Sequence, residues 1–319
     1  MRKMKKVLIV AGVFPPEPIV SANLMFELAI ELSKRYSVTV LRPHPTRPLG
    51  FMMPHWEPKD LPFDVVTIES YTYPKSKLIG RFRESFSMGK AVVKYIEKHH
   101  DNIDFIFNDA WHLFGINMIA KTAVRYGIKY ITPVQDIYPE SLISKLPKIP
   151  LIQHMVKSFL LPIDKYNLSH AAKIHTISEK MVDTLSETRQ IPKEKFFVVR
   201  NWQDDKQFTD FQSTKRPSDS NNDALTLMYL GNVGYLAGLE VVIDAVKSLQ
   251  GKNIKFIIAG SGAAKNNLKE RAEGDERISF MAVPAGAVPA TQDLADIMIL
   301  PVKRGFALSS IPSKLPAYM

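Results

Sequence analysis

The stretch VLIVAGVFPPEP (residues 7–18), followed by SANLMFELAIELSKR (residues 21–35), has the pattern of a buried strand that leads into an amphipathic helix. The run Val7–Val13 is apolar throughout, and Met25, Leu28, Ala29 and Leu32 recur with helical spacing. A basic start and a short apolar run are also typical of a secretion signal. Residues 15–18, three of them proline, replace the cleavage site that a signal needs, so the pattern favours a first strand.

Short apolar runs and amphipathic segments continue to alternate up to residue 200, which indicates a parallel sheet covered by helices. A capping box of Thr176, Ile177, Ser178 and Glu179, ahead of Met181, Val182 and Leu185, predicts the start of one of these helices. The predicted strands are Val7–Val13, Val38–Arg42, Phe63–Ile68, Phe105–Phe107, Lys129–Val134, Ile174–Ile177 and Phe196–Arg200.

A second alternating series follows the polar stretch 215–223, which reads as a linker. Its predicted strands are Leu225–Leu230, Ile254–Ala259, Ile278–Met281 and Ile297–Leu300, with a helix that carries Leu239, Val242, Ile243, Val246 and Leu249 on one side. The sequence therefore predicts an α/β protein of two Rossmann-like, doubly wound domains, residues 1–205 and 223–319. Ligands are expected at the carboxyl ends of the strands.

The last residues bear on the completeness of the second domain. After Leu300 the chain ends at Met319, inside the predicted start of another helix. Because four strands would leave one flank of the sheet thinly covered, we expect a further strand and helix of roughly 30 residues beyond this point. The second domain is therefore expected to be incomplete.

Composition and charge limit the classes of function. With 45% hydrophobic and 23% charged residues, the 319-residue chain is globular, and its net charge of +10 favours anionic ligands. No basic run is interleaved with aromatic residues, so nucleic-acid binding is not expected. The absence of cysteine excludes disulfides and fits a reducing compartment, and the eight histidines show no metal-binding spacing. No run of 18 apolar residues predicts a membrane span.

Two segments of the second domain are candidates for phosphate binding. Gly231, Asn232 and Gly234 follow an apolar strand and precede a helix, where backbone N–H groups are available to a phosphate; a tight turn that binds nothing is the alternative. Residues 305–314 place Ser309 and Ser313 beside Lys314, which suits a diphosphate, although an exposed loop has the same composition.

Three residues of the first domain are candidates for catalysis. Asp136 and Glu140 follow the strand Lys129–Val134, and His112 follows the preceding strand. These positions lie at strand ends, where active sites accumulate. Helix capping by the two carboxylates and a structural role for the histidine are the alternatives.

Taken in order, these segments resemble the retaining GT-B glycosyltransferases of family 4, in particular the bacterial branch that builds surface polysaccharides. The segments that carry the resemblance cover the whole chain: VLIVAGVFPPEP, PVQDIYPESL, KIHTISEKMVDTL, VVRNW, YLGNVGYLAGLE and DIMILPVKRGFALSSIPSKLPAYM. The resemblance implies that the second domain binds a nucleoside diphosphate sugar and that the first domain takes the acceptor. It implies no other cofactor and no metal.

The resemblance also implies roles for individual residues. Gly231, Asn232 and Gly234 correspond to positions beside the donor pyrophosphate, and Ser313 and Lys314 to positions beside the same diphosphate or the ribose. The remaining positions that it implies are Ser21 near the acceptor and donor sugar, Asn201 near the cleft between the domains, and His112 beside the sugar.

Charged residues that many relatives carry are missing from the donor segment. An arginine and a lysine of the phosphate loop are replaced by Asn232 and Ala237, and two glutamates by Ser309 and Ala317. Lys303, Arg304 and Lys314 are the nearby cations that can substitute. We interpret these replacements as the mark of a sub-branch that binds the donor through different residues.

The predicted reaction is transfer of a hexosyl or N-acetylhexosaminyl group from a nucleoside diphosphate sugar to a lipid-linked or saccharide acceptor, in lipopolysaccharide or capsule biosynthesis. A nucleotide-sugar epimerase of the same fold and a non-catalytic truncated fragment are the alternatives. We expect a cytoplasmic protein. The basic segment 73–82 also suggests peripheral contact with the inner membrane, with a solvated loop as its alternative.

Overall fold

The computed structural model describes residues 4–47, 53, 56, 59–73, 78–110, 112–143, 146–202, 206–213, 224–235, 237–284, 286–302 and 314–318. The chain divides into two compact units, unit 1 (Met1–Asn201) and unit 2 (Trp202–Met319). The boundary therefore lies a few residues before the predicted end of the first domain at residue 205.

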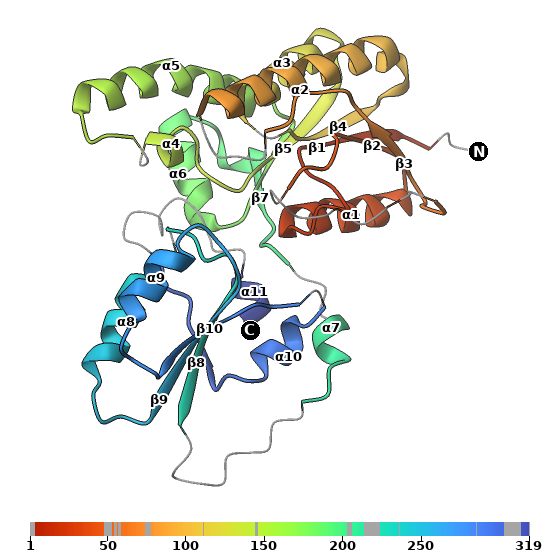
Figure 1. Cartoon of the computed structure of the whole chain (residues 1–319). Helices are drawn as coiled ribbons and strands as arrows, with labels where there is room; N and C mark the ends of the chain where they lie inside the picture. Colours follow the sequence, from red (N-terminus) through yellow and green to blue (C-terminus); the bar gives the residue numbers. More distant parts are fainter. Residues whose placement is uncertain are drawn as a thin grey trace. The chain divides into compact units, whose positions relative to one another are not determined.

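Unit 1 contains a seven-stranded parallel sheet in the order β3-β2-β1-β4-β5-β6-β7 (Figure 1). Its interior strand β1 is apolar on both faces from Val7 onward, and Ile9 lies opposite Val40 of β2 and Phe107 of β4, all of them buried. The strands are β1 (Lys6–Ala11), β2 (Ser37–Arg42), β3 (Asp64–Thr67), β4 (Phe105–Asp109), β5 (Lys129–Val134), β6 (Lys173–Thr176) and β7 (Phe196–Val198).

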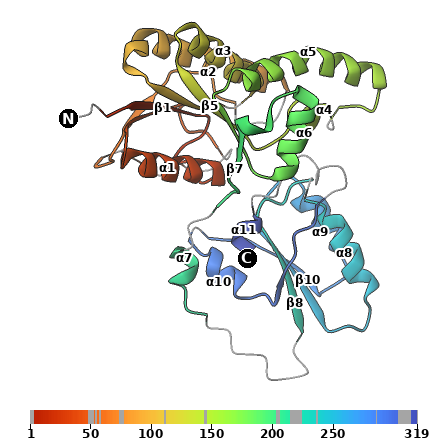
Figure 2. The same ribbon diagram turned by 180° about the vertical axis from the view of Figure 1, so that it is seen from behind.

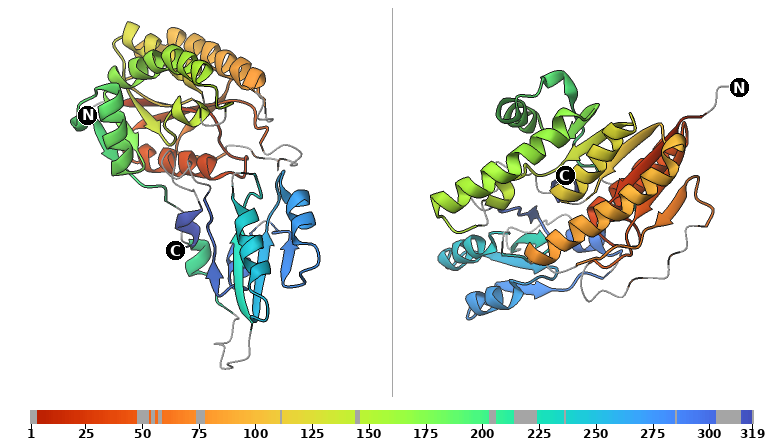
Figure 3. Two further views of the ribbon diagram at one scale, coloured as in Figure 1. Left: turned by 90° about the vertical axis from the view of Figure 1, so that its left-hand side faces the viewer. Right: turned by 90° about the horizontal axis from the view of Figure 1, so that it is seen from above.

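Helices cover both faces of this sheet, with α1 on one face and α2, α3 and α5 on the other (Figures 1 and 3). Helix α6 starts in the predicted region, but its cap is Ser178, whose Oγ accepts a hydrogen bond from the backbone N–H of Met181, whereas Thr176 of the predicted capping box ends β6. The helices of unit 1 are α1 (Val20–Ser33), α2 (Leu78–His99), α3 (Leu113–Arg125), α4 (Glu140–Ile143), α5 (Pro150–Ser169) and α6 (Glu179–Arg189), with short 3-10 turns at His100–Asn102 and Lys193–Lys195.

Strand β1 pairs with β2 on one side, the strand that follows it in the chain, and with β4 on its other side. The carboxyl ends of β1 and β4 are therefore neighbours at the point where the strand order reverses, and the backbone N–H of Gly12 donates to the carbonyl oxygen of Asp109 at 3.0 Å. Ligands of doubly wound sheets bind at such a switch point.

Unit 2 contains a four-stranded parallel sheet in the order β10-β9-β8-β11 (Figure 2). Helices α8 and α9 pack side by side on one face, where Ile243, Val246 and Leu268 join Phe256 and Ile258 in a buried core. The elements are α7 (Lys206–Thr209), β8 (Leu225–Leu230), α8 (Leu239–Ser248), β9 (Ile254–Ala259), α9 (Lys265–Ala272), β10 (Ile278–Met281), α10 (Val288–Gln292), β11 (Ile297–Met298) and α11 (Leu315–Tyr318).

The predicted fold class is confirmed, because both units are parallel α/β structures whose strands lie where the apolar runs predicted them. Strand β4 continues to Asp109, two residues beyond the predicted end, since its polar residues Asn108 and Asp109 still pair with β1. The described helices include none with the length and apolarity that a bilayer span requires.

Candidate functional site

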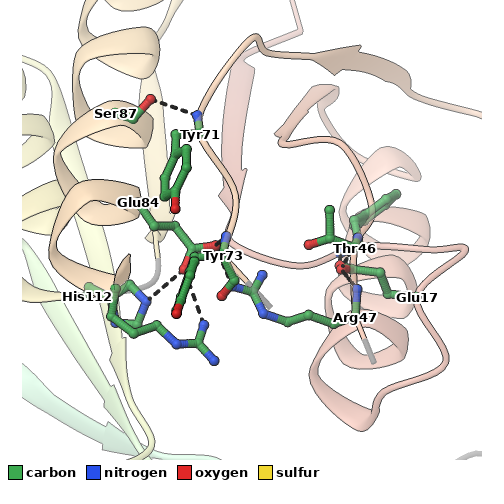
Figure 4. A network of polar contacts seen from close by, with 10 residues as sticks. Glu17, Thr46, Arg47, Tyr71, Tyr73, Glu84, Ser87 and His112 are labelled. Atoms are coloured by element: carbon green, nitrogen blue, oxygen red, sulfur yellow. Dashed lines mark hydrogen bonds and ion pairs between the residues drawn. The ribbon is translucent and has the colours of Figure 1, made fainter. Parts of the chain in front are cut away.

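A buried polar network lies at the carboxyl edge of the unit 1 sheet (Figure 4). Its centre is the Glu84 carboxylate on α2, which forms an ion pair with Arg47 and accepts hydrogen bonds from Arg81 Nη1 and from the backbone N–H of Tyr73, each at 3.2 Å. The Nε2 atom of His112 lies 3.5 Å from the same carboxylate. We call these five residues the Glu84 network.

The Glu84 carboxylate is held in its ionised form. Glu84 is only 5% exposed, and burial by itself would raise its pKa. The hydrogen bonds from His112 and Arg47, together with the charge of Arg47, outweigh this effect and lower the pKa of Glu84 to about 2. The network therefore contains a permanent negative charge at neutral pH.

His112 adopts a backbone conformation that few residues with a side chain adopt. It precedes α3 with φ of 77°, in the region that favours glycine. Its carbonyl oxygen accepts a hydrogen bond from Ser85 Oγ at 3.4 Å, and Glu84 lies beside its ring. Such strain persists only where the surrounding contacts fix it, and it is concentrated at functional sites.

The loops that follow β1 and β2 are fixed to each other by Glu17. Its carboxylate accepts hydrogen bonds from the backbone N–H groups of Thr46 at 2.9 Å and Arg47 at 2.8 Å, and from Phe14 at 3.4 Å (Figure 4). This arrangement sets the backbone from which Arg47 reaches Glu84. Glu17 and the Glu84 network together connect loops that follow four neighbouring strands.

Asp109 contributes a second buried carboxyl at this edge. It ends β4 at the switch point, and burial raises its pKa to about 7. Its Oδ2 atom has no hydrogen-bond partner among the described residues. Burial therefore favours the neutral form of this carboxyl.

The other predicted residues of unit 1 have different surroundings. Asp136 is exposed after β5, Ser21 lies half-buried in the first turn of α1, and Asn201 is half-buried at the end of the unit. The two carboxylate oxygens of Glu140 each accept a 2.7 Å hydrogen bond from Arg189. This pair connects α4 to α6 and fixes the Glu140 side chain, and a catalytic role for Glu140 stays a prediction.

Arg189 is fully buried and donates hydrogen bonds to four residues, one of them the Thr188 hydroxyl at 2.7 Å. Besides Glu140, its Nε donates to Asp164 at 2.8 Å and its Nη2 to the carbonyl oxygen of Tyr138 at 2.6 Å. Burial would lower the pKa of Arg189, but these two carboxylates raise it. The charge of Arg189 is therefore matched inside the protein and is not offered to a ligand.

In unit 2, Gly231 and Lys314 meet at the carboxyl end of β8. Gly231 has φ of 143°, and a Cβ atom at this position would overlap the Cε atom of Lys314. The Nζ atom of Lys314 lies 5.2 Å from the centre of the Tyr229 ring. Burial lowers the pKa of Lys314. The family resemblance placed both residues beside one diphosphate, although 83 residues separate them and no local pattern connects them.

The second glycine turn, at the end of β9, packs directly on the first. A Cβ at Gly260 would overlap the carbonyl oxygen of Gly231, and a Cβ at Gly262 would overlap that of Val233. Lys265 follows this turn, and its Nζ donates to the Gly260 carbonyl oxygen at 3.2 Å. Glycine is therefore needed here for close backbone packing, and Lys265 is a cation near the site that the sequence pattern did not single out. We call Gly231–Gly234, Gly260–Gly262, Lys265 and Lys314 the glycine-loop site.

Helix α11 fixes Lys314 in this position. The Tyr318 hydroxyl accepts a hydrogen bond from the backbone N–H of Leu230 at 2.9 Å and donates to its carbonyl oxygen at 2.7 Å. Gln292 donates to the carbonyl oxygen of Ala317 at 2.9 Å. Ser309 and Ser313, together with the proposed substitute cations Lys303 and Arg304, lie outside the described residues.

Helix α8 follows the glycine turn, as predicted, after a short connection. Four residues separate Gly234 from its first residue, Leu239, and its cap is Gly238 with φ of 70°. Asn232 is exposed in the turn, and its carbonyl oxygen accepts a hydrogen bond from the Tyr229 hydroxyl at 2.7 Å. The turn Gly231–Gly234 is therefore separated in sequence from the helix start, which Gly238 caps.

Comparison with known proteins identifies relatives of both units. The Glycosyltransferase Family 4 model matches residues 21–207, and the "Glycosyl transferases group 1" model matches residues 210–310. The Escherichia coli (strain K12) protein "Putative colanic acid biosynthesis glycosyl transferase WcaI" is 28% identical over 209 residues, which cover 63% of this chain and 50% of that protein. The chain thus spans about half the length of the curated relatives it matches.

Solved structures with the same fold include Anabaena Alr3699/HepE in complex with UDP, with a TM-score of 0.58 and 13% identity over 94% of this chain and 74% of that one. WaaG, a glycosyltransferase involved in lipopolysaccharide biosynthesis, has a TM-score of 0.60 and 13% identity over 93% of this chain and 75% of that one. These likenesses establish the two-domain GT-B fold.

The Glycosyltransferase Family 4 model covers more than half of the residues of this chain. The chain therefore belongs to glycosyltransferase family 4.

Proposed function

We propose that this protein transfers a sugar from a nucleoside diphosphate sugar to a lipid-linked or saccharide acceptor in the biosynthesis of a cell-surface polysaccharide. The observation that carries the proposal is the contact of Lys314 with Gly231 in the glycine-loop site. A lysine beside a glycine turn provides a cation and accessible backbone N–H groups, which together suit a diphosphate. A uridine nucleotide is the first candidate, since HepE was solved in complex with UDP.

The proposed catalytic role of unit 2 is to stabilise the departing diphosphate. As the bond from the anomeric carbon to the phosphate oxygen breaks, negative charge develops on the diphosphate. Lys314 and Lys265 are the cations of the glycine-loop site that can balance it, since the N–H groups of Gly231, Val233 and Gly260 already donate to backbone carbonyl oxygens. Resemblance to family 4 implies retention of configuration at the anomeric carbon.

The Glu84 network is the proposed binding site for the reacting sugar in unit 1. The ionised Glu84 fixes the ring of His112, which then presents its other edge for a hydrogen bond or proton transfer to a sugar hydroxyl. Asp109 and Asp136 are further carboxyl groups at this edge. Ser21 and Asn201 stay candidates for sugar contacts.

The finer assignments are also proposals. We infer a hexosyl or N-acetylhexosaminyl donor and a cytoplasmic protein that contacts the inner membrane peripherally. The expected membrane segment 73–82 lies partly outside the described residues, and its part from Leu78 onward begins α2. The exposed side chains of Ile79 and Phe82 support a contact at this end of α2.

The donor site is tested by thermal unfolding with and without UDP, GDP and their sugars. A nucleotide that binds the folded chain raises the midpoint by mass action, corresponding to about 2.7 kcal/mol at 100 times its Kd. Lys314→Met should remove most of this shift, and the exposed control Lys269→Met on α9 should retain it. An equal shift in both variants, or none with any nucleotide in the folded protein, would refute the proposed donor site.

A further inference from the structure

Two tyrosines follow β3 at the carboxyl edge of the unit 1 sheet. The rings of Tyr71 and Tyr73 lie nearly parallel, with an angle of 18° between their planes and 6.2 Å between their centres. Tyr71 is 38% exposed and Tyr73 is half-buried. Figure 4 shows both residues on the loop beside α2. We call Tyr71 and Tyr73 the tyrosine pair.

The backbone of the tyrosine pair is fixed by hydrogen bonds to α2. The backbone N–H of Tyr71 donates to Ser87 Oγ at 2.8 Å, and that of Tyr73 donates to the Glu84 carboxylate at 3.2 Å. Gly80 lies directly against the Tyr73 ring, because a Cβ atom at this position would overlap the ring. The two rings are therefore presented by a backbone that is already in place, which lowers the entropic cost of binding a ligand.

An arginine beside the tyrosine pair has no counter-charge of its own. The guanidinium carbon of Arg83 lies 4.8 Å from the centre of the Tyr71 ring. Arg83 is exposed and forms no ion pair with any described residue, whereas Arg81 on the same helix pairs with Glu84. The N–H groups of Arg83 are therefore available to oxygen atoms of a ligand that lies on the tyrosine pair.

Aromatic rings with a hydrogen-bond donor at their edge suit a sugar. A pyranose ring carries C–H groups that pack on an aromatic face, and its hydroxyl groups need polar partners around that face. The tyrosine pair supplies two nearly parallel rings, and Arg83 and the phenolic hydroxyl groups supply the polar partners. This combination of groups favours a saccharide over a purely apolar ligand.

We propose that the tyrosine pair binds a sugar unit of the acceptor, with C–H groups of the sugar packed on the rings and its hydroxyl groups bonded to Arg83. The proposal rests on the proposed function, in which the reacting sugar lies at the Glu84 network. Glu84 connects the two places, since it accepts the Tyr73 hydrogen bond and lies 3.5 Å from His112. The acceptor is then a saccharide, or a lipid that already carries one, and not a bare lipid phosphate.

Saturation-transfer difference NMR of the chain with cellobiose, maltose or chitobiose tests this site without a nucleotide. We expect saturation transfer to the ring C–H protons of at least one of these disaccharides. Tyr71→Leu with Tyr73→Leu should weaken the binding about tenfold, because the aromatic contacts are lost. Arg83→Gln should weaken it about fivefold, because a charged hydrogen-bond donor is lost.

The matched control is Tyr126→Leu, at the opposite end of the strands. Tyr126 is also half-buried and contacts a neighbouring ring, that of His100, at 4.3 Å between the centres. This variant should bind the disaccharides as the parent chain does. Equal binding by the parent chain and the double tyrosine variant, or no transfer to any of the three sugars from the folded parent chain, would overturn the proposal.

The thermal shift with UDP separates this proposal from the proposed function. The double tyrosine variant should keep the shift of the parent chain, because the glycine-loop site lies in unit 2. If the double variant does not fold, Tyr71→Leu alone decides, since the more exposed ring is removed and its backbone hydrogen bond to Ser87 stays possible. Sugar binding that depends on the tyrosine pair in a chain that binds no nucleotide would refute the proposed donor site and leave this site intact.

Discussion

Replacing Glu84 by glutamine tests the electrostatics of the Glu84 network. In the folded protein the pKa of Glu84 is lowered from 4.5 to about 2, because the bonds from His112 and Arg47 outweigh the effect of burial. At about 1.36 kcal/mol per pKa unit, this difference corresponds to a contribution of about 3 kcal/mol to the free energy of unfolding at neutral pH. Glu84→Gln should lose an amount of this order, since the buried Arg47 then lacks its counter-charge.

The pH dependence gives the sign of the effect. A carboxyl whose folded pKa is depressed stabilises the fold above its unfolded pKa of about 4.5, and this contribution is lost as the pH falls toward 2. The difference between the parent chain and Glu84→Gln should therefore be largest at pH 7 and should shrink below pH 4.5. Urea denaturation at a series of pH values, followed by tryptophan fluorescence, measures it.

A matched control is available on the same helix. Glu97, near the end of α2, is exposed and lies 3.6 Å from Arg125, so Glu97→Gln should change stability by no more than about 0.5 kcal/mol. Adding Arg47→Met to Glu84→Gln should recover part of the lost stability by removing the unpaired charge. A loss below about 1 kcal/mol for Glu84→Gln, or one that is equal at every pH, would refute the reasoning.

Three further substitutions follow from the geometry. Arg189→Met leaves Glu140 and Asp164 without their buried partner and should cost about 3–5 kcal/mol in urea denaturation, and a loss under about 1 kcal/mol would contradict that role. Gly260→Ala forces a Cβ onto the Gly231 carbonyl oxygen at φ of 132° and should lower stability by about 2 kcal/mol or more, whereas Gly274→Ala, where φ is also positive but no atom lies nearby, should cost less. Tyr318→Phe removes both hydrogen bonds to Leu230 and should cost about 1–2 kcal/mol and weaken nucleotide binding, which calorimetric titration measures; unchanged affinity would show that α11 does not hold Lys314 in place.

Local patterns in the sequence predicted the architecture well. The apolar runs and helical spacings placed the strands and the helix after β1, because parallel strands buried on both faces leave a signal that is independent of distant residues. Helix α8 carries the apolar residues Leu239, Val242, Ile243 and Val246 that the helical spacing predicted.

The sites depended more on contacts between distant residues. His112 was recognised at the end of its strand, but its partner Glu84 lies 28 positions earlier on another helix and has no motif. Glu140 was predicted to be catalytic from its position, and its pairing with Arg189, 49 residues later, could not be read from a local pattern. Close packing of the Gly231 and Gly260 turns likewise becomes visible only when β8 and β9 pair.

Photoaffinity labelling with 5-azido-UDP, followed by peptide mapping, tests the central claim most directly. If unit 2 holds the nucleotide of the donor, the label should appear on peptides that contain the Gly231 turn, the Gly260 turn or Lys314. Excess UDP should prevent this labelling, and Lys314→Met should reduce it. Labelling confined to peptides of unit 1, or labelling of unit 2 that UDP does not displace, would contradict the account.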